Sequence, residues 1–328
     1  MIRTLSYSRD GKLRIDVKPE EFGDLIADPQ NLLWVDFQEH DNAEAETILS
    51  DVFNFHPLAI DDALQETHVP KVDDWGKFLY IVLHAVVFQP GSDDHIQTQE
   101  LDVFLGPNYV VTHHDDPIQA VDKVWSYIQR DERQLKYGVD HLLYRLVDEL
   151  VAHYMPAVDA LDDLIDTLED EVFGDPTSRT LAMIFATKRA VLHLRRIIGP
   201  QREVMNKLAR DDYRVIDSQA KVYFRDVYDH LVRLYDISES IRDLVGGTLD
   251  SYLSVINNRM NEIMKTLTVI TVLFMPLSFI TSFFGMNFFA PDPPIISWVS
   301  RPAFILTLLA LVLMPVGMYY WIRRRGWM

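Results

Sequence analysis

The chain has no cysteine among its 328 residues. This absence excludes disulfides, thiolate nucleophiles, zinc fingers and cysteine-ligated iron–sulfur clusters. The chain also lacks an excess of positive charge, because 49 acidic residues outnumber 31 basic ones and give a net charge of −18. A polyanion of this kind binds nucleic-acid phosphates poorly. We therefore expect no nucleic-acid partner.

Enzyme motifs are missing as well. No Walker A, G-x-G-x-x-G, G-x-S-x-G or H-E-x-x-H pattern occurs, so the sequence gives no reason to expect nucleotide-driven transport or hydrolysis. We expect a protein that is not an enzyme and has no organic cofactor. The run from Val111 to Asp116 contains metal-ligand residue types, but it ends a predicted strand before Pro117. Adjacent histidines in a strand also point to opposite faces, which does not suit a shared metal ion, so we interpret this run as a loop.

Two long uncharged runs stand out near the C-terminus. Residues 267–284 and 302–322 contain no charge, and each run is long enough to cross about 30 Å of hydrocarbon as a helix. Tyr319, Tyr320 and Trp321 stand where an interfacial aromatic belt would lie, and three arginines follow at once. The alternative is a buried hairpin in a soluble core. The lengths favour two transmembrane helices.

The flanking cations predict the orientation. Arg259 and Lys265 precede the first span and residues 323–325 are all arginine, whereas the connecting loop carries only Asp292 and Arg301. By the positive-inside rule both termini should be cytoplasmic. Residues 1–14 have no apolar stretch of the signal-peptide type. We expect a multi-pass protein of the cell (inner) membrane, embedded in its lipid bilayer, with residues 1 to about 260 in the cytosol.

The net charge divides unevenly along this boundary. Five of the 31 basic residues and two of the 49 acidic ones follow residue 260, so the first 260 residues carry −21 and the remainder +3. A domain this acidic is not suited to lie on the anionic inner leaflet of the membrane. We expect it to project into the cytosol and to attract cations.

Residues 1–116 have the pattern of an α/β domain. Short β-rich runs alternate with turns and with two helical segments, at 43–53 and 59–66. The expected strands are 2–6, 13–17, 33–37, 77–88, 99–104 and 109–112. The pattern predicts a sheet covered by helices.

A helical region follows over residues 117–220. Gly174-Asp175-Pro176 stops one helix, Thr177 and Ser178 are suited to cap the next, and Gly199-Pro200 suggests a softer break. From 221 to 284 no proline occurs before Pro276, which predicts one helix of roughly 95 Å that continues into the first span. Such a helix needs partner helices, and copies of itself are the simplest supply. An external loop at 285–301 and a second span with a basic cytosolic tail at 302–328 complete the chain.

The long helix carries a polar stripe, which we call the seam. Facing lipid, these groups would lack hydrogen-bond partners, so the seam should face protein or water. Ser and Thr could simply join neighbouring helices, or several copies could line a pore with methionine constrictions. Steps of three and four residues connect Asp250, Ser254, Asn257, Asn261, Met264, Thr268, Thr271, Met275, Ser278 and Ser282.

Gly285-Met286-Asn287 follows the first span directly. Together with two C-terminal spans, a basic tail and a long helix leaving an acidic α/β domain, this motif resembles the CorA family of magnesium and cobalt transporters. The resemblance covers essentially the whole chain. Further matching segments are His56-Pro57-Leu58-Ala59-Ile60-Asp61-Asp62, Pro70-Lys71-Val72, residues 224–230, residues 264–267 and Met275-Pro276-Leu277.

The resemblance implies a fold class and residue roles. The fold would be an α/β cytosolic domain with a long helical stalk and two transmembrane helices, assembled as a homopentameric funnel. Gly285, Met286 and Asn287 would form the selectivity motif that meets the hydrated ion. Asp62 and a neighbouring subunit's Asp226 would bind regulatory Mg²⁺. The pore would be lined by Asp250 at its inner end and by Asn261, Met264, Leu267, Thr271, Met275 and Ser278.

The implied function is channel-like transport of divalent cations, chiefly Mg²⁺ with Co²⁺ or Ni²⁺ as alternates, gated by cytosolic Mg²⁺. Mg²⁺ gives up its water shell reluctantly. Neutral side-chain oxygens suit this ion because they can hold it by its bound water molecules without removing them. Family members commonly follow the motif with an acidic loop, but residues 288–298 contain only one acidic residue, Asp292. Two alternatives stay open: a zinc transporter on the same scaffold, and a membrane-anchored metal sensor that does not conduct.

Overall fold

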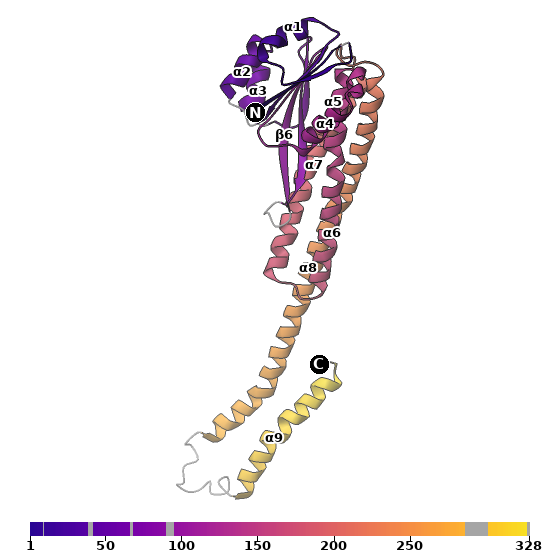
Figure 1. The fold of residues 1–328 in the computed structure, drawn as a ribbon. Helices are drawn as coiled ribbons and strands as arrows, with labels where there is room; N and C mark the ends of the chain where they lie inside the picture. The colour runs from indigo at the N-terminus through magenta and orange to yellow at the C-terminus, as the bar shows by residue number, and fades with distance from the viewer. Residues whose placement is uncertain (9, 39–41, 66–67, 90–94, 286–300, 327–328) are drawn as a thin grey trace. The chain divides into compact units, whose positions relative to one another are not determined.

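The computed structural model describes residues 1–8, 10–38, 42–65, 68–89, 95–285 and 301–326. Two compact units divide the chain, Met1–Asp250 and Ser251–Met328. The first unit is an α/β domain with a helical extension, and the second contains two long apolar helices (Figure 1). This confirms the expected combination of an α/β domain, a long helix and two candidate membrane helices.

The described part of the first unit contains a seven-stranded sheet in the order β2-β1-β3-β7-β6-β5-β4. Strands β3 and β7 pair in parallel and every other neighbouring pair is antiparallel. The edge strand β4 was not predicted, because Lys71-Val72-Asp73-Asp74 is short and mostly charged and lacks an apolar pattern. The strands are β1 Ile2–Tyr7, β2 Leu13–Ile15, β3 Leu32–Gln38, β4 Lys71–Asp74, β5 Leu79–Phe88, β6 Ile96–Leu105 and β7 Tyr109–His114.

Helices cover both faces of this sheet (Figure 1). One face packs against α1 (Phe22–Ala27), α2 (Asn42–Asp51) and α3 (Pro57–Gln65) in a core that includes Val35, Tyr80 and Phe104. The other face packs against α4 (Gln119–Arg130), α5 (Val139–Ala152), α6 (Tyr154–Phe173) and α7 (Ser178–Arg210). There the rings of Trp34 and Trp125 lie 4.8 Å apart. Two 3₁₀ helices, η1 (Pro19–Glu21) and η2 (Glu132–Tyr137), complete the domain.

The helical extension shows one expected boundary and one error. Helix α6 ends before Gly174, and Thr177 caps α7 through a reciprocal capping box with Thr180. The expected break at Gly199-Pro200 is wrong, because α7 runs through Pro200. A proline removes only one donor from the helix, and tertiary contacts hold the chain on its C-terminal side. There Gln201 is fully buried and its Oε1 accepts a hydrogen bond of 3.0 Å from the backbone N–H of His84.

Helix α8 (Ala220–Gly285) begins in the first unit and ends in the second, and α9 (Arg301–Arg324) belongs to the second. Both contain stretches long and apolar enough to span a membrane, and only 6% of each such stretch is buried. A hairpin in a soluble core would be mostly buried. The exposure therefore favours transmembrane helices over that alternative.

Candidate functional site

The seam of α8 is uncovered in the second unit. Met264, Leu267 and Met275 are 55%, 56% and 66% exposed, and Asn261, Thr271 and Ser278 are also exposed. Five residues between Asn261 and Phe283 are less exposed than the rest: Val269, Leu273, Pro276, Leu277 and Ile280. At 3.6 residues per turn these five lie about 180° around the helix from the seam.

Helix α9 carries a matching stripe. Its partly or fully buried residues follow spacings of four, four, three and four, which places them on one helix face. They are Thr307, Leu311, Pro315, Met318 and Ile322. The two stripes indicate that α8 and α9 cover each other there. Between Asn261 and Ser278 the seam therefore lies on the side of α8 away from α9, where its side chains are exposed in the described structure.

Threonine hydroxyls on the seam bond to their own helix. The Oγ1 atoms of Thr268 and Thr271 donate to the carbonyl oxygens of Met264 and Leu267, at 2.7 and 2.8 Å. The expectation that these hydroxyls would be unsatisfied in lipid is therefore wrong for the two threonines, because the helix itself accepts their protons. Their oxygen lone pairs remain available as acceptors. These two threonines therefore give the seam hydrogen-bond acceptors, which suit ligands that donate hydrogen bonds.

The structure describes the inner end of the expected pore, at Asp250, but only the first residue of the Gly285-Met286-Asn287 motif at its outer end. Asp250 is exposed and is the last residue of the first unit. Gly285 is the last residue of α8. Met286 and Asn287 lie outside the described residues, so the selectivity motif stays a prediction.

Asp62, on α3, is already engaged. Its Oδ2 accepts a hydrogen bond of 2.5 Å from Lys71 Nζ, and its Oδ1 lies 3.8 Å from His68 Nε2. The carboxylate is 29% exposed. Lys71 belongs to the segment Pro70-Lys71-Val72 that carries the family resemblance, but the resemblance does not predict its ion pair with Asp62. This ion pair depends on the pairing of β4 with β5, and no local pattern in the sequence indicates that pairing.

Asp226 lies on α8, exposed, near α5. Burial raises the pKa of Asp148, on α5, and the charge of Asp226 adds to that shift. No hydrogen bond or ion pair joins Asp226 to Asp62 within the described chain, and the prediction had assigned them to different subunits. Across the described residues, no three His, Asp or Glu side chains are grouped closely enough to hold a metal ion.

A second carboxylate supports the segment beside Asp62. Glu100, on β6, accepts hydrogen bonds of 3.1 and 3.0 Å from the backbone N–H of His68. His84 Nε2 lies 2.6 Å from the carbonyl oxygen of His68. Burial, and then the nearby Asp102, raise the pKa of Glu100 to about 7. Sequence reasoning missed Glu100 because its partner is a backbone group 32 residues away.

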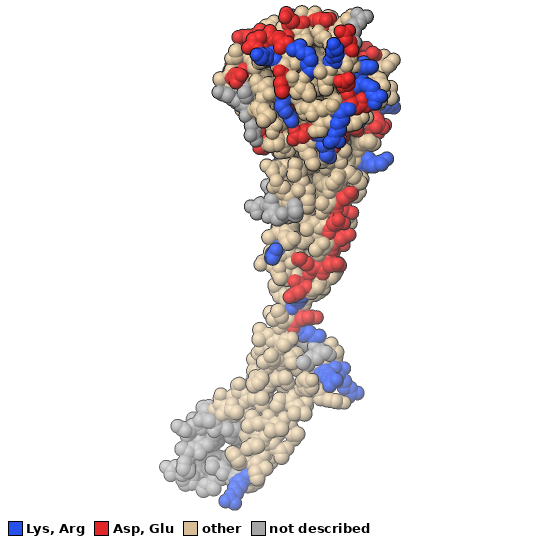
Figure 2. Space-filling view, viewed as in Figure 1, with Lys and Arg blue, Asp and Glu red and all other residues tan. Residues whose placement is uncertain are grey.

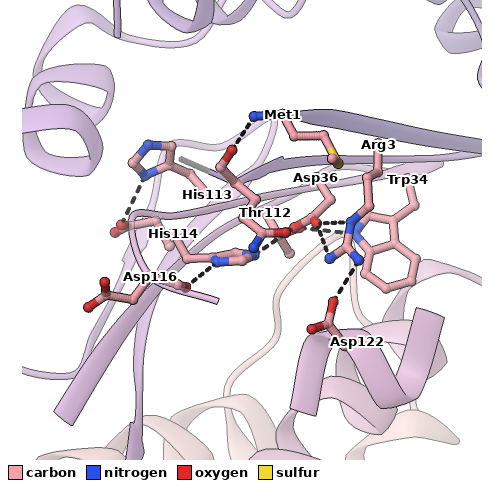
Figure 3. Close-up of polar contacts among 11 residues, drawn as sticks. Met1, Arg3, Trp34, Asp36, Thr112, His113, His114, Asp116 and Asp122 are labelled. Atoms are coloured by element: carbon pink, nitrogen blue, oxygen red, sulfur yellow. Dashed lines mark hydrogen bonds and ion pairs between the residues drawn. The ribbon is translucent and has the colours of Figure 1, made fainter. Parts of the chain in front are cut away.

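The opposite face of the sheet holds a buried polar network (Figure 3). Asp36 is fully buried; its Oδ2 accepts from Arg3 at 2.6 Å and its Oδ1 accepts from Thr112 at 2.5 Å. His114 Nε2 lies 3.3 Å from Asp36 Oδ1. Burial would raise the pKa of Asp36, but His114 and Arg3 outweigh it and hold that pKa below its usual range. The network thus pairs the buried carboxylate of Asp36 with Arg3, Thr112 and His114.

The interpretation of residues 113–116 as a loop is partly wrong. Strand β7 continues through His113 and His114, and both side chains are buried. The two histidines do point to opposite faces, as a strand requires. His114 faces Asp36, whereas His113 Nδ1 lies 3.7 Å from Asp102 Oδ2 on the other face.

Comparisons with known proteins agree with one another. The family model described as "CorA-like Mg2+ transporter protein" matches residues 29–324. The cobalt/magnesium transport protein CorA of Thermotoga maritima is 32% identical over 297 residues, which cover 90% of this chain and 83% of that protein.

Two solved structures show the same fold. The complete structure of the CorA magnesium transporter from Methanocaldococcus jannaschii matches with a TM-score of 0.82 at 23% identity, covering 99% of this chain and 98% of that one. The ZntB cytoplasmic domain from Vibrio parahaemolyticus matches with a TM-score of 0.61 at 12% identity, covering 79% of this chain and 99% of that one. The family match extends from β3 of the α/β domain through the long helix and both apolar helices. The chain therefore belongs to the CorA family, whose members are membrane transporters of divalent cations and not enzymes.

Proposed function

We propose that the chain assembles as a homopentamer that conducts chiefly Mg²⁺, with Co²⁺ or Ni²⁺ as alternates, along the electrochemical gradient of the ion. It would lie in the cell (inner) membrane with both termini in the cytosol. The observation that carries the proposal is the seam: a polar and methionine stripe, exposed, on the side of α8 opposite the stripe that α9 covers. Several copies turned inward would enclose it, and α9 would form the outer ring.

The chemistry of the seam suits a hydrated ion. Water molecules in the shell of Mg²⁺ donate hydrogen bonds outward, and Mg²⁺ releases these waters reluctantly. The Thr271 hydroxyl, whose proton is used by Leu267, can only accept. Asn261 adds an amide oxygen from each copy, while Met264 and Met275 offer no oxygen and would act as hydrophobic constrictions. Such a path holds the water shell of the ion and leaves the ion free to move on.

Regulation would use the acidic first unit. Copies of a domain carrying about −21 repel one another, and Mg²⁺ bridging Asp62 to a neighbour's Asp226 would offset this repulsion and hold the closed state. Both carboxylates reach solvent in one chain, as a site shared between copies requires. Loss of cytosolic Mg²⁺ would then open the path.

The test is uptake by liposomes that contain the purified protein, with Mg²⁺, Co²⁺ and Zn²⁺ compared with and without a proton gradient. Mg²⁺ uptake that Asn287→Ala abolishes, with the oligomer intact, supports the proposal. Zinc uptake driven by protons would favour a zinc transporter. Equal, negligible flux in wild type and variant would favour a sensor that does not conduct.

The regulatory part has its own test. Asp62→Asn and Asp226→Asn should each weaken inhibition by Mg²⁺ on the cytosolic side while leaving uptake at low cytosolic Mg²⁺ intact. Inhibition that is unchanged in both variants would remove these two residues from the regulatory site without affecting the conduction proposal.

A further inference from the structure

The ammonium group of Lys71 occupies a site built from three partners. Its Nζ lies 2.5 Å from Asp62 Oδ2, 3.3 Å from Asp73 Oδ2 and 5.2 Å from the centre of the Tyr80 ring. Two carboxylates and an aromatic face are the groups that bind an ammonium ion. Lys71 is therefore held in place and is 26% exposed.

The backbone on both sides of Lys71 is also fixed. Lys71 begins β4, where it pairs with Val82 of β5. Three residues earlier, the backbone of His68 is bonded to Glu100 through its N–H and to His84 through its carbonyl oxygen. The sheet thus sets the backbone position from which the Lys71 side chain extends.

The ion pair with Lys71 occupies one oxygen of the Asp62 carboxylate. Asp62 Oδ2 accepts the hydrogen bond from Lys71 Nζ, and Asp73 brings a second carboxylate to the same ammonium. One oxygen of Asp62 is consequently bound to a cation of the same chain. A metal ion that approaches Asp62 must share that carboxylate with the ammonium or displace it.

We propose that Lys71 is an internal counter-cation that competes with Mg²⁺ for Asp62 and thereby sets the cytosolic Mg²⁺ concentration at which transport is inhibited. This inference rests on the proposed regulatory role of Asp62. Asp73 makes the exchange reversible, because the displaced ammonium keeps one carboxylate partner within 3.3 Å of its present place.

Removing the charge of Lys71 should strengthen Mg²⁺ binding. Partly exposed ion pairs are worth at most about 1 kcal/mol, so Lys71→Met should lower the half-inhibitory Mg²⁺ concentration about two- to fivefold. Lys71→Arg keeps a cation beside Asp62 and should stay close to wild type. Lys77→Met is the matched control, since Lys77 is an exposed lysine of the same β4–β5 hairpin region and the variant makes the same change of net charge.

The experiment measures Mg²⁺ uptake in liposomes as Mg²⁺ on the cytosolic face is varied, and in parallel the rise in Tm that Mg²⁺ produces in the full chain in detergent. Lys71→Gln replaces Lys71→Met if the latter does not fold. The expected result is inhibition and stabilisation at lower Mg²⁺ in the neutral variant alone, and no shift when Asp62→Asn is added.

The outcomes separate the two claims. If Asp62→Asn abolishes inhibition and the neutral Lys71 variant matches wild type or needs more Mg²⁺, the competition is overturned and the regulatory site stands. If Lys77→Met shifts inhibition as much as Lys71→Met, the effect is one of net charge and the competition is again overturned. If Mg²⁺ inhibits the Asp62→Asn variant as strongly as wild type, the proposed regulatory role of Asp62 and the competition with Lys71 fail together.

Discussion

The two units differ in where their large apolar side chains lie: they are mostly buried in the first unit and mostly exposed in the second. In the first unit the large side chains Trp34, Phe104 and Tyr154 are fully buried, and the buried charge of Asp36 is paired. In the second unit Phe279 and Leu306 are each 71% exposed. Figure 2 shows charged side chains spread over the first unit and a mostly uncharged surface on the second.

This difference shows what each unit needs from its surroundings. The first unit pairs the buried charge of Asp36 internally, as a domain in water requires. In the second unit the threonine hydroxyls of α8 donate to carbonyl oxygens of the same helix, and apolar side chains are exposed, as suits a segment in lipid. Between Asn261 and Ser278 the side chains of its polar seam are exposed in the described structure, so the proposed conducting path needs several copies.

The largest expected effect breaks the buried pairing of the first unit. Asp36→Ala leaves Arg3, Thr112 and His114 without their shared acceptor, which should cost about 3–5 kcal/mol of stability. The midpoint of thermal unfolding in detergent measures the loss. Asp122→Ala removes the second carboxylate that pairs with Arg3. The side chain of Asp122 is 47% exposed, so this change should cost less than about 1 kcal/mol of stability. Equal losses of stability in the two variants would contradict the claim that a buried ion pair costs more to break than an exposed one.

A pH-dependent effect should come from Glu100. Its pKa is raised to about 7 in the fold, so its contribution to stability is fully present below its ordinary pKa of 4.5 and is lost as the pH rises through 7. Relative to wild type, Glu100→Gln should therefore gain stability between pH 5 and pH 8. After allowance for solvent screening we expect about 1–2 kcal/mol.

Thermal unfolding of both proteins at the two pH values measures this gain. Glu20→Gln, at an exposed glutamate, serves as the control and should show no such pH-dependent difference. A constant difference between wild type and Glu100→Gln at both pH values would contradict the buried, proton-binding role of Glu100.

A smaller effect concerns the cap of α7. Thr177→Ala removes the side-chain acceptor for the N–H of Thr180 and should cost about 1 kcal/mol, whereas Thr177→Ser keeps the oxygen and should cost less. Thermal unfolding again measures the change. If serine and alanine are equally destabilising, the packing of the Thr177 methyl group matters more than the cap.

Elements with a strong local pattern could be predicted from the sequence. The apolar strands β5 and β7 and the long helix α8 have clear periodicity, and Thr177 has the chemistry of a cap. Elements fixed by distant partners could not be predicted. Strand β4 exists because Lys71–Asp74 pairs with β5, and α7 continues through Pro200 because its surroundings hold it.

The candidate site divides in the same way. Spacing alone placed Asn261, Thr271 and Ser278 on one helix face, and the structure leaves that face uncovered. The pairing of Asp62 with Lys71 depends on the register between β4 and β5 and on the position of α3, which no local pattern encodes. The roles of Met286 and Asn287 rest on the family resemblance and stay predictions.

The central claim is that the seam of α8 lines the cation path, and cysteine accessibility tests it most directly. The chain has no cysteine, so Thr271→Cys on the seam and Leu273→Cys on the side that α9 covers each introduce a single reactive thiol per chain. Mg²⁺ uptake by liposomes is measured before and after treatment with a charged methanethiosulfonate reagent. We expect treatment to block uptake through Thr271→Cys and to leave Leu273→Cys unchanged. Block of Leu273→Cys with no effect on Thr271→Cys would contradict the claim.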